Sequence, residues 1–599
     1  MNRFVKSLVA ALPPSLLLSS FSFGVGAQEA LEPVVVTATR QQTRVSEILA
    51  DVTVIEREEI ERAGSETIID LLARQPGIQM ARSGGPGTSA SLYVRGTNSN
   101  QTKVLVDGIP INSIDSSGSP LRFLSLADVE RIEILRGPAA TMYGADAIGG
   151  VIQIFTRRGA PGLSAEAFAG YGSYDTAQGS VGLSAGNELV RLRADFQQSH
   201  SGGFSAMKNA SGQDADDDAY RNRGGTASLV LTPLAGHEMG FVLRQNDGRA
   251  HYDDSYNAYQ DFRTQQWQVY TRNALTDAWT STLRIGHTLD WQKHVSSGLS
   301  RFRTENDEYS WQNDVALPLG RAMLALERFE QKAPWLGDAP SEESIAINSA
   351  VAAWSANLGP HRWQLSARHD QHSTFGGQDT YALAYGYQIA REWRAHASLG
   401  TSFKAPSLYE LFHPNYGNPH LEPEKGRNRE VALVWERDQQ SASLTYYHNR
   451  VRNLIGWVVS DFFNVSEARF EGATLAYEGA AAGWQWRTSY DWLQAIDETT
   501  DKPLARRARH SATASLWRQW GAWNAGLEWV GVGRRYNDNT KSDELGAYSL
   551  FNLVASHRFA PDLKLEARID NLFDKNYESA RGYNTPGLSA FVGLRYTPR

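Results

Sequence analysis

Alternation of apolar and polar residues with a period of two runs from residue 161 to residue 599, and it constrains the fold more than any other feature. Val190, Leu192 and Ala194, for example, alternate with Arg191 and Arg193. Successive side chains of a β-strand point to opposite faces of a sheet, so each such segment has one apolar and one polar face. The pattern therefore predicts an all-β region of 439 residues (599 − 160).

A barrel in an outer membrane accounts for this region better than a soluble β-sheet protein does. The region is longer than common β-sandwiches, and no repeat of blade length indicates a β-propeller. Dividing its 439 residues among 22 strands leaves about 20 residues for each strand with its connection, which suits large plugged barrels. We predict an all-β transmembrane barrel of about 22 antiparallel strands over residues 161–599.

Composition excludes several other classes of protein. After the first thirty residues no apolar run approaches the ~20 residues of a membrane-spanning helix, which excludes a helical membrane protein. The chain has no cysteine, so disulfides, thiolate metal sites and cysteine nucleophiles are excluded. Its net charge is -7, with Lys and Arg dispersed among a small excess of acids, and we expect no nucleic-acid partner.

The N-terminal part of the chain is expected to contain three segments. Residues 1–27 combine a basic start, an apolar stretch and small residues at the end, as in a secretory signal peptide. Residues 28–50 are expected to form a periplasmic segment. Residues 51–160 mix short strands with a helix that is predicted to begin at a Ser65 N-cap and to stop before Pro76. They predict an α+β plug domain small enough to sit inside the barrel lumen.

Several motifs together resemble those of TonB-dependent outer-membrane transporters, and most closely the cobalamin (vitamin B12) transporters of Gram-negative bacteria. The similarity runs from Glu32 to Tyr596. It is carried by Glu32–Ala38, Tyr93–Asn98, Val104–Gly108, Arg136–Pro138, Tyr143–Ile152, Ser402–Pro406, Tyr416–Glu424 and Asp570–Tyr577. The resemblance implies a multi-pass β-barrel in the outer membrane that takes up a ligand and catalyses no reaction.

The most N-terminal motif resembles the Ton box of this family. It comprises Glu32, Pro33, Val34, Val35, Val36, Thr37 and Ala38. Three consecutive valines in a polar tail indicate an unpaired, β-prone segment that can add as a strand to the edge of a partner's sheet. The alternative is a strand of the plug itself. The resemblance implies that the partner is TonB of the inner-membrane TonB-ExbB-ExbD complex.

Two plug loops and two barrel positions are expected to contact the ligand. The loops Ser83–Ser91 and Ile111–Ser119 are rich in Gly and Ser, and by the resemblance their tips touch a corrinoid from below. The positions carried over are Thr88, Ser89, Ala90, Ser91, Ser116, Ser117, Tyr252 and Arg506. The alternative for each loop residue is simple solvation.

An acidic run, Asp214–Asp218, indicates a candidate calcium site. In a strand Asp214, Asp216 and Asp218 project from one face, where they repel one another unless a cation binds, and calcium takes six to eight oxygen ligands. By the resemblance Asp253 and Asp261 and the backbone of Tyr252 add ligands. An EF-hand is excluded, since Ala219 follows Asp218 where that loop requires Gly. The alternative is a solvated acidic loop.

The function implied is TonB-dependent transport of cobalamin or another corrinoid into the periplasm. The nearest alternative is a receptor for a ferric siderophore or haem, and the more distant ones are a passive porin and an outer-membrane enzyme. No spacing of Ser, His and Asp nominates a catalytic set. The glycine-rich stretch Gly144–Gly150 lacks the Lys-Ser/Thr of a phosphate loop, so no nucleotide is expected. A monomer in contact with outer-membrane lipid and lipopolysaccharide is expected.

Overall fold

The computed structural model describes residues 34–35, 37–62, 67–114, 118–137, 139–208, 215–254, 258–337, 339–458 and 461–598. The expected signal peptide, residues 1–27, lies outside the described residues. So do Glu32, Pro33 and Val36 of the predicted Ton box, together with Ser116 and Ser117 of the second ligand loop.

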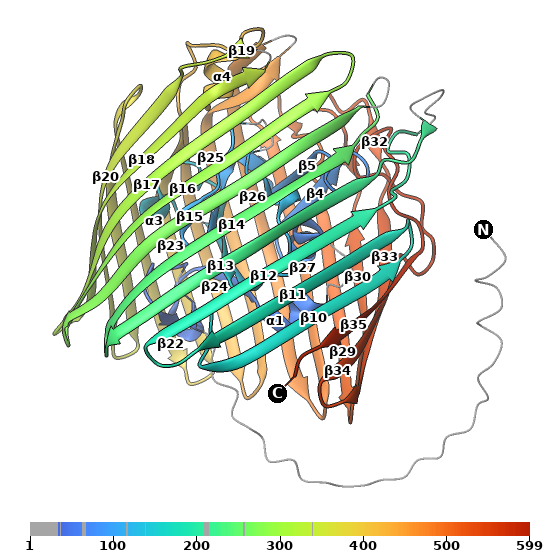
Figure 1. Cartoon of the computed structure of the whole chain (residues 1–599). Helices are drawn as coiled ribbons and strands as arrows, with labels where there is room; N and C mark the ends of the chain where they lie inside the picture. Colours follow the sequence, from blue (N-terminus) through green and yellow to red (C-terminus); the bar gives the residue numbers. More distant parts are fainter. Residues whose placement is uncertain are drawn as a thin grey trace.

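A closed antiparallel barrel of 22 long strands forms the outer part of the molecule, which confirms the predicted fold class (Figure 1). The barrel closes because β10 pairs with β35. The long strands are β10 (Gly162–Gly172), β11 (Thr176–Gly186), β12 (Val190–Ser201), β13 (Tyr220–Leu234), β14 (His237–His251), β15 (Tyr259–Thr276), β16 (Trp279–Val295), β17 (Leu299–Leu317), β18 (Gly320–Gly337), β20 (Ser344–Leu358), β21 (His361–His372), β22 (Gly376–Ala390), β23 (Trp393–Lys404), β24 (Glu424–Arg437), β25 (Gln440–Val458), β26 (Asp461–Ala481), β27 (Trp484–Asp497), β29 (His510–Trp520), β30 (Trp523–Val532), β33 (Tyr548–Ala560), β34 (Leu563–Asp570) and β35 (Ser589–Tyr596).

The two ends of the barrel differ in the length of their connections. At one end the strands from β11 to β34 are joined by turns of two or three residues, such as 187–189 and 438–439. At the other end long loops occur, and they hold α4 (Leu408–Phe412) and the short strands β19 (Ala339–Pro340), β28 (Lys502–Pro503), β31 (Arg535–Tyr536) and β32 (Glu544–Leu545). In outer-membrane barrels short turns face the periplasm and long loops face the exterior.

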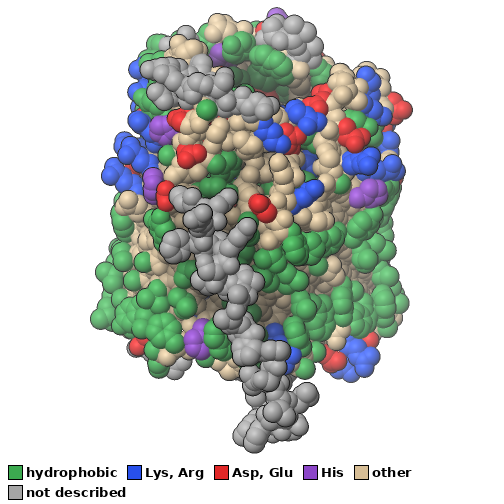
Figure 2. All heavy atoms as spheres, turned by 90° about the vertical axis from the view of Figure 1, so that its right-hand side faces the viewer, with side chains coloured by type: hydrophobic (Ala, Val, Ile, Leu, Met, Phe, Trp, Pro, Cys, Tyr) green, Lys and Arg blue, Asp and Glu red, His purple; other side chains and the backbone are tan. Residues whose placement is uncertain are grey.

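The apolar face of the alternating strands points outward. Leu192 and Phe196 of β12 are 48% and 51% exposed, whereas Arg193 and Gln197, the residues that follow each of them, are buried in the lumen. Figure 2 shows the resulting apolar band on one face of the barrel, with charged side chains gathered mainly above and below it. Exposed tryptophans lie next to the short turns, at Trp279, Trp393, Trp520 and Trp523, where an interfacial aromatic girdle belongs. None of the described helices has the length and apolar character needed to cross a membrane.

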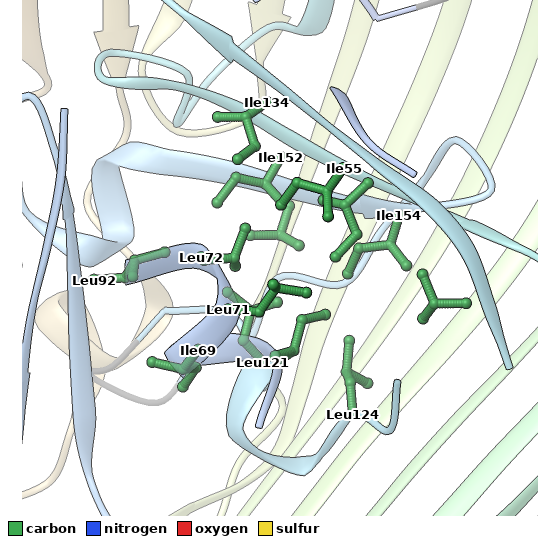
Figure 3. Close-up of a cluster of buried hydrophobic side chains, with 14 of the residues drawn as sticks. Ile55, Ile69, Leu71, Leu72, Leu92, Leu121, Leu124, Ile134, Ile152 and Ile154 are labelled. Atoms are coloured by element: carbon green, nitrogen blue, oxygen red, sulfur yellow. The ribbon is translucent and has the colours of Figure 1, made fainter. Parts of the chain in front are cut away.

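The plug lies inside the lumen and is built around a five-stranded sheet of order β3-β8-β9-β6-β7 (Figure 1). Its elements are β3 (Asp51–Ile55), α1 (Arg57–Arg62), α2 (Ile68–Ala73), β4 (Ile78–Arg82), β5 (Ala90–Val94), η3 (Ser99–Gln101), β6 (Thr102–Val106), β7 (Ile109–Pro110), η4 (Leu121–Phe123), β8 (Val129–Arg136), α3 (Ala140–Tyr143) and β9 (Gly150–Thr156). A small hairpin of β1 (Val34–Val35) and β2 (Thr43–Arg44), followed by η2 (Val45–Glu47), precedes it. In Figure 3 side chains from the sheet, including Ile134 and Ile154, pack against Leu71 and Leu72 of α2 to form the plug's own core.

The helix α2 begins two residues later than the predicted Ser65 cap. Thr67 is the N-cap, and its side chain accepts a hydrogen bond from the amide of Asp70 while the Asp70 carboxylate accepts one from the Thr67 amide. This reciprocal arrangement is a capping box, in which both orphan amides are satisfied. Because Ile68, Ile69, Leu71 and Leu72 are all buried, the cap fixes which face of α2 enters the core.

Arg95 and Arg136 of the plug belong to one network of ion pairs, and one of them reaches the barrel wall. Arg95 bonds Glu430 of β24 at 2.6 Å and Asp51 of the plug at 2.7 Å. Arg136 bonds Asp51 at 3.1 Å and the hydroxyl of Thr53 at 2.9 Å, and both of these partners belong to the plug. Asp51 thus joins the two guanidinium groups, and only Arg95 extends the network to the wall.

Candidate functional site

The described part of the predicted Ton box is paired and partly buried, which differs from the unpaired segment that the sequence predicts. Val34 and Val35 pair with Arg44 and Thr43 in the small hairpin, rather than with the plug sheet. A short strand whose only partner is a neighbouring two-residue strand is held by few hydrogen bonds. Because few hydrogen bonds hold it, this segment can exchange its hairpin pairing for pairing with the sheet edge of another protein.

Thr37 anchors the segment to the plug. It is fully buried, and its amide and hydroxyl both donate to one carboxylate oxygen of Glu133, at 2.8 Å and 2.6 Å. The hydroxyl of Tyr143 donates to the Thr37 carbonyl at 2.8 Å. Ala38 packs against the apolar cluster around α3, and Arg40 forms an ion pair with Glu327 of the barrel. Specific polar contacts thus hold the segment at the periplasmic end of the lumen.

The first predicted ligand loop lies at the tip of the β4–β5 hairpin of the plug. Thr88 is buried and its hydroxyl donates to the carbonyl of Gly85 at 2.7 Å, so it shapes the loop. Ser89 is exposed, whereas Ala90 is buried and Ser91 is half-buried at the start of β5. Of these four residues Ser89 is therefore the one whose side chain is free to meet a ligand.

The two barrel positions predicted to contact the ligand lie in different loops. The ring of Tyr252, in the loop after β14, packs edge-on against His294 with centroids 6.3 Å apart. Arg506, in the connection between β28 and β29, has a left-handed φ of 65° and donates from Nε to Asn537 at 3.1 Å. Each residue already has a protein partner, so ligand contact requires those partners to be shared or exchanged.

Two of the predicted metal ligands, Asp218 and Asp253, meet on the extracellular side of the barrel. Both are buried, at 4% and 7% exposure, and their carboxyl groups share a hydrogen bond. The amide of Ala206 donates to Asp218 at 2.7 Å, and the amide of Met207 donates to Asp253 at 2.6 Å. The hydroxyl of Ser205 also donates to Asp253, at 3.2 Å. Burial, together with the negative charges of Asp253 and Asp216, raises the pKa of Asp218 to about 7 against the effect of the Ala206 amide.

The other two predicted metal ligands are placed differently. Asp216 is exposed, yet close enough for its charge to raise the pKa of Asp218. Asp261 accepts two hydrogen bonds from Arg249, at 2.7 Å and 3.0 Å, and is neutralised by it. Within the described ranges no group of three or more His, Cys, Asp or Glu side chains is arranged to hold a metal ion.

The donor set nevertheless suits a hard cation. Two adjacent buried carboxyl groups, one with a raised pKa, form a site where positive charge is favourable. Sequence reasoning missed the amides of Ala206 and Met207 that orient these groups, because backbone donors leave no mark in residue type. The glycine at position 203 is the residue type in the sequence that could have indicated this close approach of the loops. Its φ is +77°, and a Cβ there would lie 1.9 Å from the carbonyl oxygen of Asp218.

Comparisons with known proteins match both parts of this architecture. Residues 158–572 match the family described as TonB dependent receptor-like, beta-barrel, and residues 44–151 match the TonB-dependent Receptor Plug Domain. A vitamin B12 transporter, BtuB, of Photobacterium profundum is 32% identical over 615 residues, which cover 99% of each chain.

Solved structures share the fold at lower identity. The ferric enterobactin receptor PfeA of Pseudomonas aeruginosa superposes with a TM-score of 0.81 at 19% identity, over 91% of this chain and 99% of that one. The copper transporter OprC gives a TM-score of 0.81 at 16% identity, over 91% of this chain and 99% of that one. The siderophore receptor PirA of Acinetobacter baumannii gives 0.80 at 17% identity, over 91% and 98%.

Proposed function

Because this chain belongs to the TonB-dependent receptor family of Gram-negative outer membranes, we propose that it takes up cobalamin or a closely related corrinoid into the periplasm. Members of this family are transporters and receptors rather than enzymes, and they interact with TonB and with a transported ligand. The ligand class is the part that we propose here.

One observation carries the choice of a corrinoid. The relative described as a vitamin B12 transporter is 32% identical across 99% of this chain, whereas the receptors for ferric enterobactin are 19 to 20% identical. Similarity at the lower level reflects the shared barrel and plug. Full-length similarity at the higher level supports a shared ligand.

We propose that the exposed Ser89 at the plug tip and Arg506 on the rim contact the corrinoid. Corrin side chains end in amides, which accept hydrogen bonds from guanidinium and hydroxyl groups. In this proposal Ser116 and Ser117 of the second plug loop also contact the ligand. Tyr252, in the loop after β14, contacts it from another part of the same extracellular rim.

We also propose that calcium orders the extracellular loops around the ligand. Asp218 and Asp253 would hold the ion directly, with Asp216 adding charge from the same loop. Calcium would supply the positive charge that two adjacent carboxylates require, and it would tie the loop after β12 to the loop after β14. Asp261 has its charge satisfied by Arg249, so we place it outside the ion's immediate ligands.

The remaining proposed partners are the TonB-ExbB-ExbD complex, which would supply the energy for uptake, and the lipid around the barrel. We propose that TonB of the TonB-ExbB-ExbD complex pulls on residues Glu32–Ala38 by strand addition, because no phosphate loop is present in the sequence to use a nucleotide. We propose that the protein works as a monomer surrounded by lipid and lipopolysaccharide.

Equilibrium binding of cyanocobalamin to the detergent-purified protein, with calcium and then with a chelator, tests this proposal. Tight binding that weakens on chelation is the expected result. Absence of cyanocobalamin binding in both conditions, with binding of a ferric siderophore or haem in a parallel titration, would refute the corrinoid assignment. Cyanocobalamin binding that is unaffected by the chelator would support the corrinoid assignment and refute the calcium site.

A further inference from the structure

Two cavities lie end to end between one face of the plug and one side of the barrel. The upper cavity has a volume of 250 Å³ and reaches the extracellular end at Tyr174. The lower cavity has a volume of 660 Å³ and reaches the periplasmic turn at Asp438 and Gln439. Arg74, Gln75, Thr513 and Val530 line both of them. The other cavities described beside the plug have volumes of 80 to 120 Å³.

A cluster of charges lies where the two cavities meet. Arg74, at the C-terminal end of α2, forms an ion pair with Glu528 of β30. Arg568 of β34 binds the same carboxylate at 2.8 Å and Asp570 at 2.6 Å. The cluster joins the plug to the wall through the Arg74–Glu528 ion pair and through a hydrogen bond that Arg568 donates to the carbonyl of Arg62 in α1, at 3.4 Å. The Arg74–Glu528 pair lies at the junction of the two cavities, since Arg74 lines both of them and Glu528 lines the lower one.

Polar contacts join the plug to the wall formed by β29, β30, β33 and β34, which we call the polar wall. Glu61 of α1 bonds Lys564 at 2.8 Å, and the guanidinium of Arg62 lies 4.7 Å from the ring of Trp517. None of the apolar clusters formed by described residues joins a plug residue to these four strands. Water can replace polar contacts when two surfaces separate, so this interface opens at lower cost than an apolar one.

Apolar clusters fix the plug to several other strands of the barrel. Around α3, Ala140 and Met142 pack with Met323 of β18 and Val351 of β20. Ile148 packs with residues of β25, β26 and β27. Two further clusters seat Ile114 and Phe123 on other strands of the barrel. Separation at these places would expose apolar surface to water, so the plug is held firmly there and loosely at the polar wall.

We propose that the cargo passes between the α1–α2 face of the plug and the polar wall, with the Arg74–Glu528 ion pair as the gate. This inference rests on the proposed function only for the identity of the cargo. The upper cavity is too small for a corrin ring with its side chains, so the α1–α2 side must move away from the wall. The apolar clusters act as the hinge, and the plug stays inside the barrel during transit.

Cross-linking in this cysteine-free chain tests the path directly. The pair Arg74→Cys and Glu528→Cys is joined by a reducible bifunctional thiol reagent, in cells that carry the TonB system. The matched control is the pair Thr141→Cys and Ser366→Cys, which joins α3 to β21 where the two hydroxyls lie 2.8 Å apart. Cyanocobalamin binding and uptake are measured for each pair before and after reduction of the cross-link.

Cross-linking at the polar wall is expected to abolish uptake and leave binding intact, and reduction should restore uptake. The control cross-link is expected to leave uptake at the level of its own reduced form. Equal inhibition by both cross-links would mean that the whole plug must leave or unfold, which overturns the proposal. Inhibition by the control alone, or by neither cross-link, would overturn it as well.

A second measurement does not depend on the cargo. In planar bilayers the double variant Arg74→Ala and Glu528→Ala is expected to conduct ions in discrete steps, while Thr141→Ala with Ser366→Ala stays closed. If the wild-type protein neither binds nor takes up cyanocobalamin, the proposed function fails and this conductance decides the path alone. Equal conductance of the two double variants would then overturn it.

Discussion

Calcium binding at Asp218 and Asp253 should weaken steeply below pH 7. Burial and the neighbouring charges raise the pKa of Asp218 to about 7 from its ordinary value of 3.8, and a cation binds only the ionised form. Each pH unit below 7 therefore costs about tenfold in calcium affinity, so that the affinity at pH 5 is about 100-fold lower than at pH 8. Asp218→Asn is expected to abolish both the affinity and its pH dependence.

The assay is calorimetric titration of calcium into the purified protein between pH 5 and pH 8. Asp217→Asn is the matched control, because Asp217 is exposed in the same acidic run. The effect of pH on loop stability is also testable without calcium. Because the pKa of Asp218 is raised in the folded protein, its protonated form stabilises the folded loops fully below pH 3.8, and this stabilisation is lost as the pH rises through 7. Hydrogen exchange of the loop after β12 should then be faster at pH 8 than at pH 5, after correction for intrinsic rates. A calcium affinity that is the same at pH 5 and pH 7 would refute this reasoning.

Three further predictions concern the plug and its anchors. Glu430→Gln removes the wall partner of buried Arg95 and should destabilise the seated plug by about 3 kcal/mol, measured as a shift of its denaturant midpoint; an unchanged midpoint would contradict this. Thr37→Val removes a 2.6 Å hydrogen bond to a carboxylate, so a TonB fragment should bind about tenfold more tightly without ligand, and equal affinity for wild type and variant counts against the anchor. Gly203→Ala should lower calcium affinity, because its Cβ would lie 1.9 Å from the Asp218 carbonyl oxygen; a calcium titration that matches wild type argues against this coupling.

The barrel was predictable because its signal is local. Each strand carries its own alternation, and a lipid-facing strand needs no knowledge of its partners to show which side is apolar. Leu565 and Arg568 of β34, for example, lie on the outward and lumenal faces as their pattern requires. The motifs of the plug likewise made the family recognisable from sequence, and the family matches agree with it.

The site was predictable only in part, since it depends on which loops meet. Sequence reasoning nominated Asp218 and Asp253, and the structure brings them together. It nominated Asp261 equally, yet Arg249 on the adjacent strand takes that carboxylate. Residue type is the same in both cases, and the difference arises from the partner across the strand.

The sequence by itself determined the barrel, the presence of a plug and the family, because strand periodicity and turn chemistry are properties of neighbouring residues. Tertiary structure alone decided how the plug is held. Arg136 turns inward to Asp51 while Arg95 reaches Glu430, and apolar clusters fix some walls while ion pairs such as Arg74–Glu528 hold the polar wall. These choices depend on contacts between residues hundreds of positions apart, whose spacing is set only when the barrel closes around the plug.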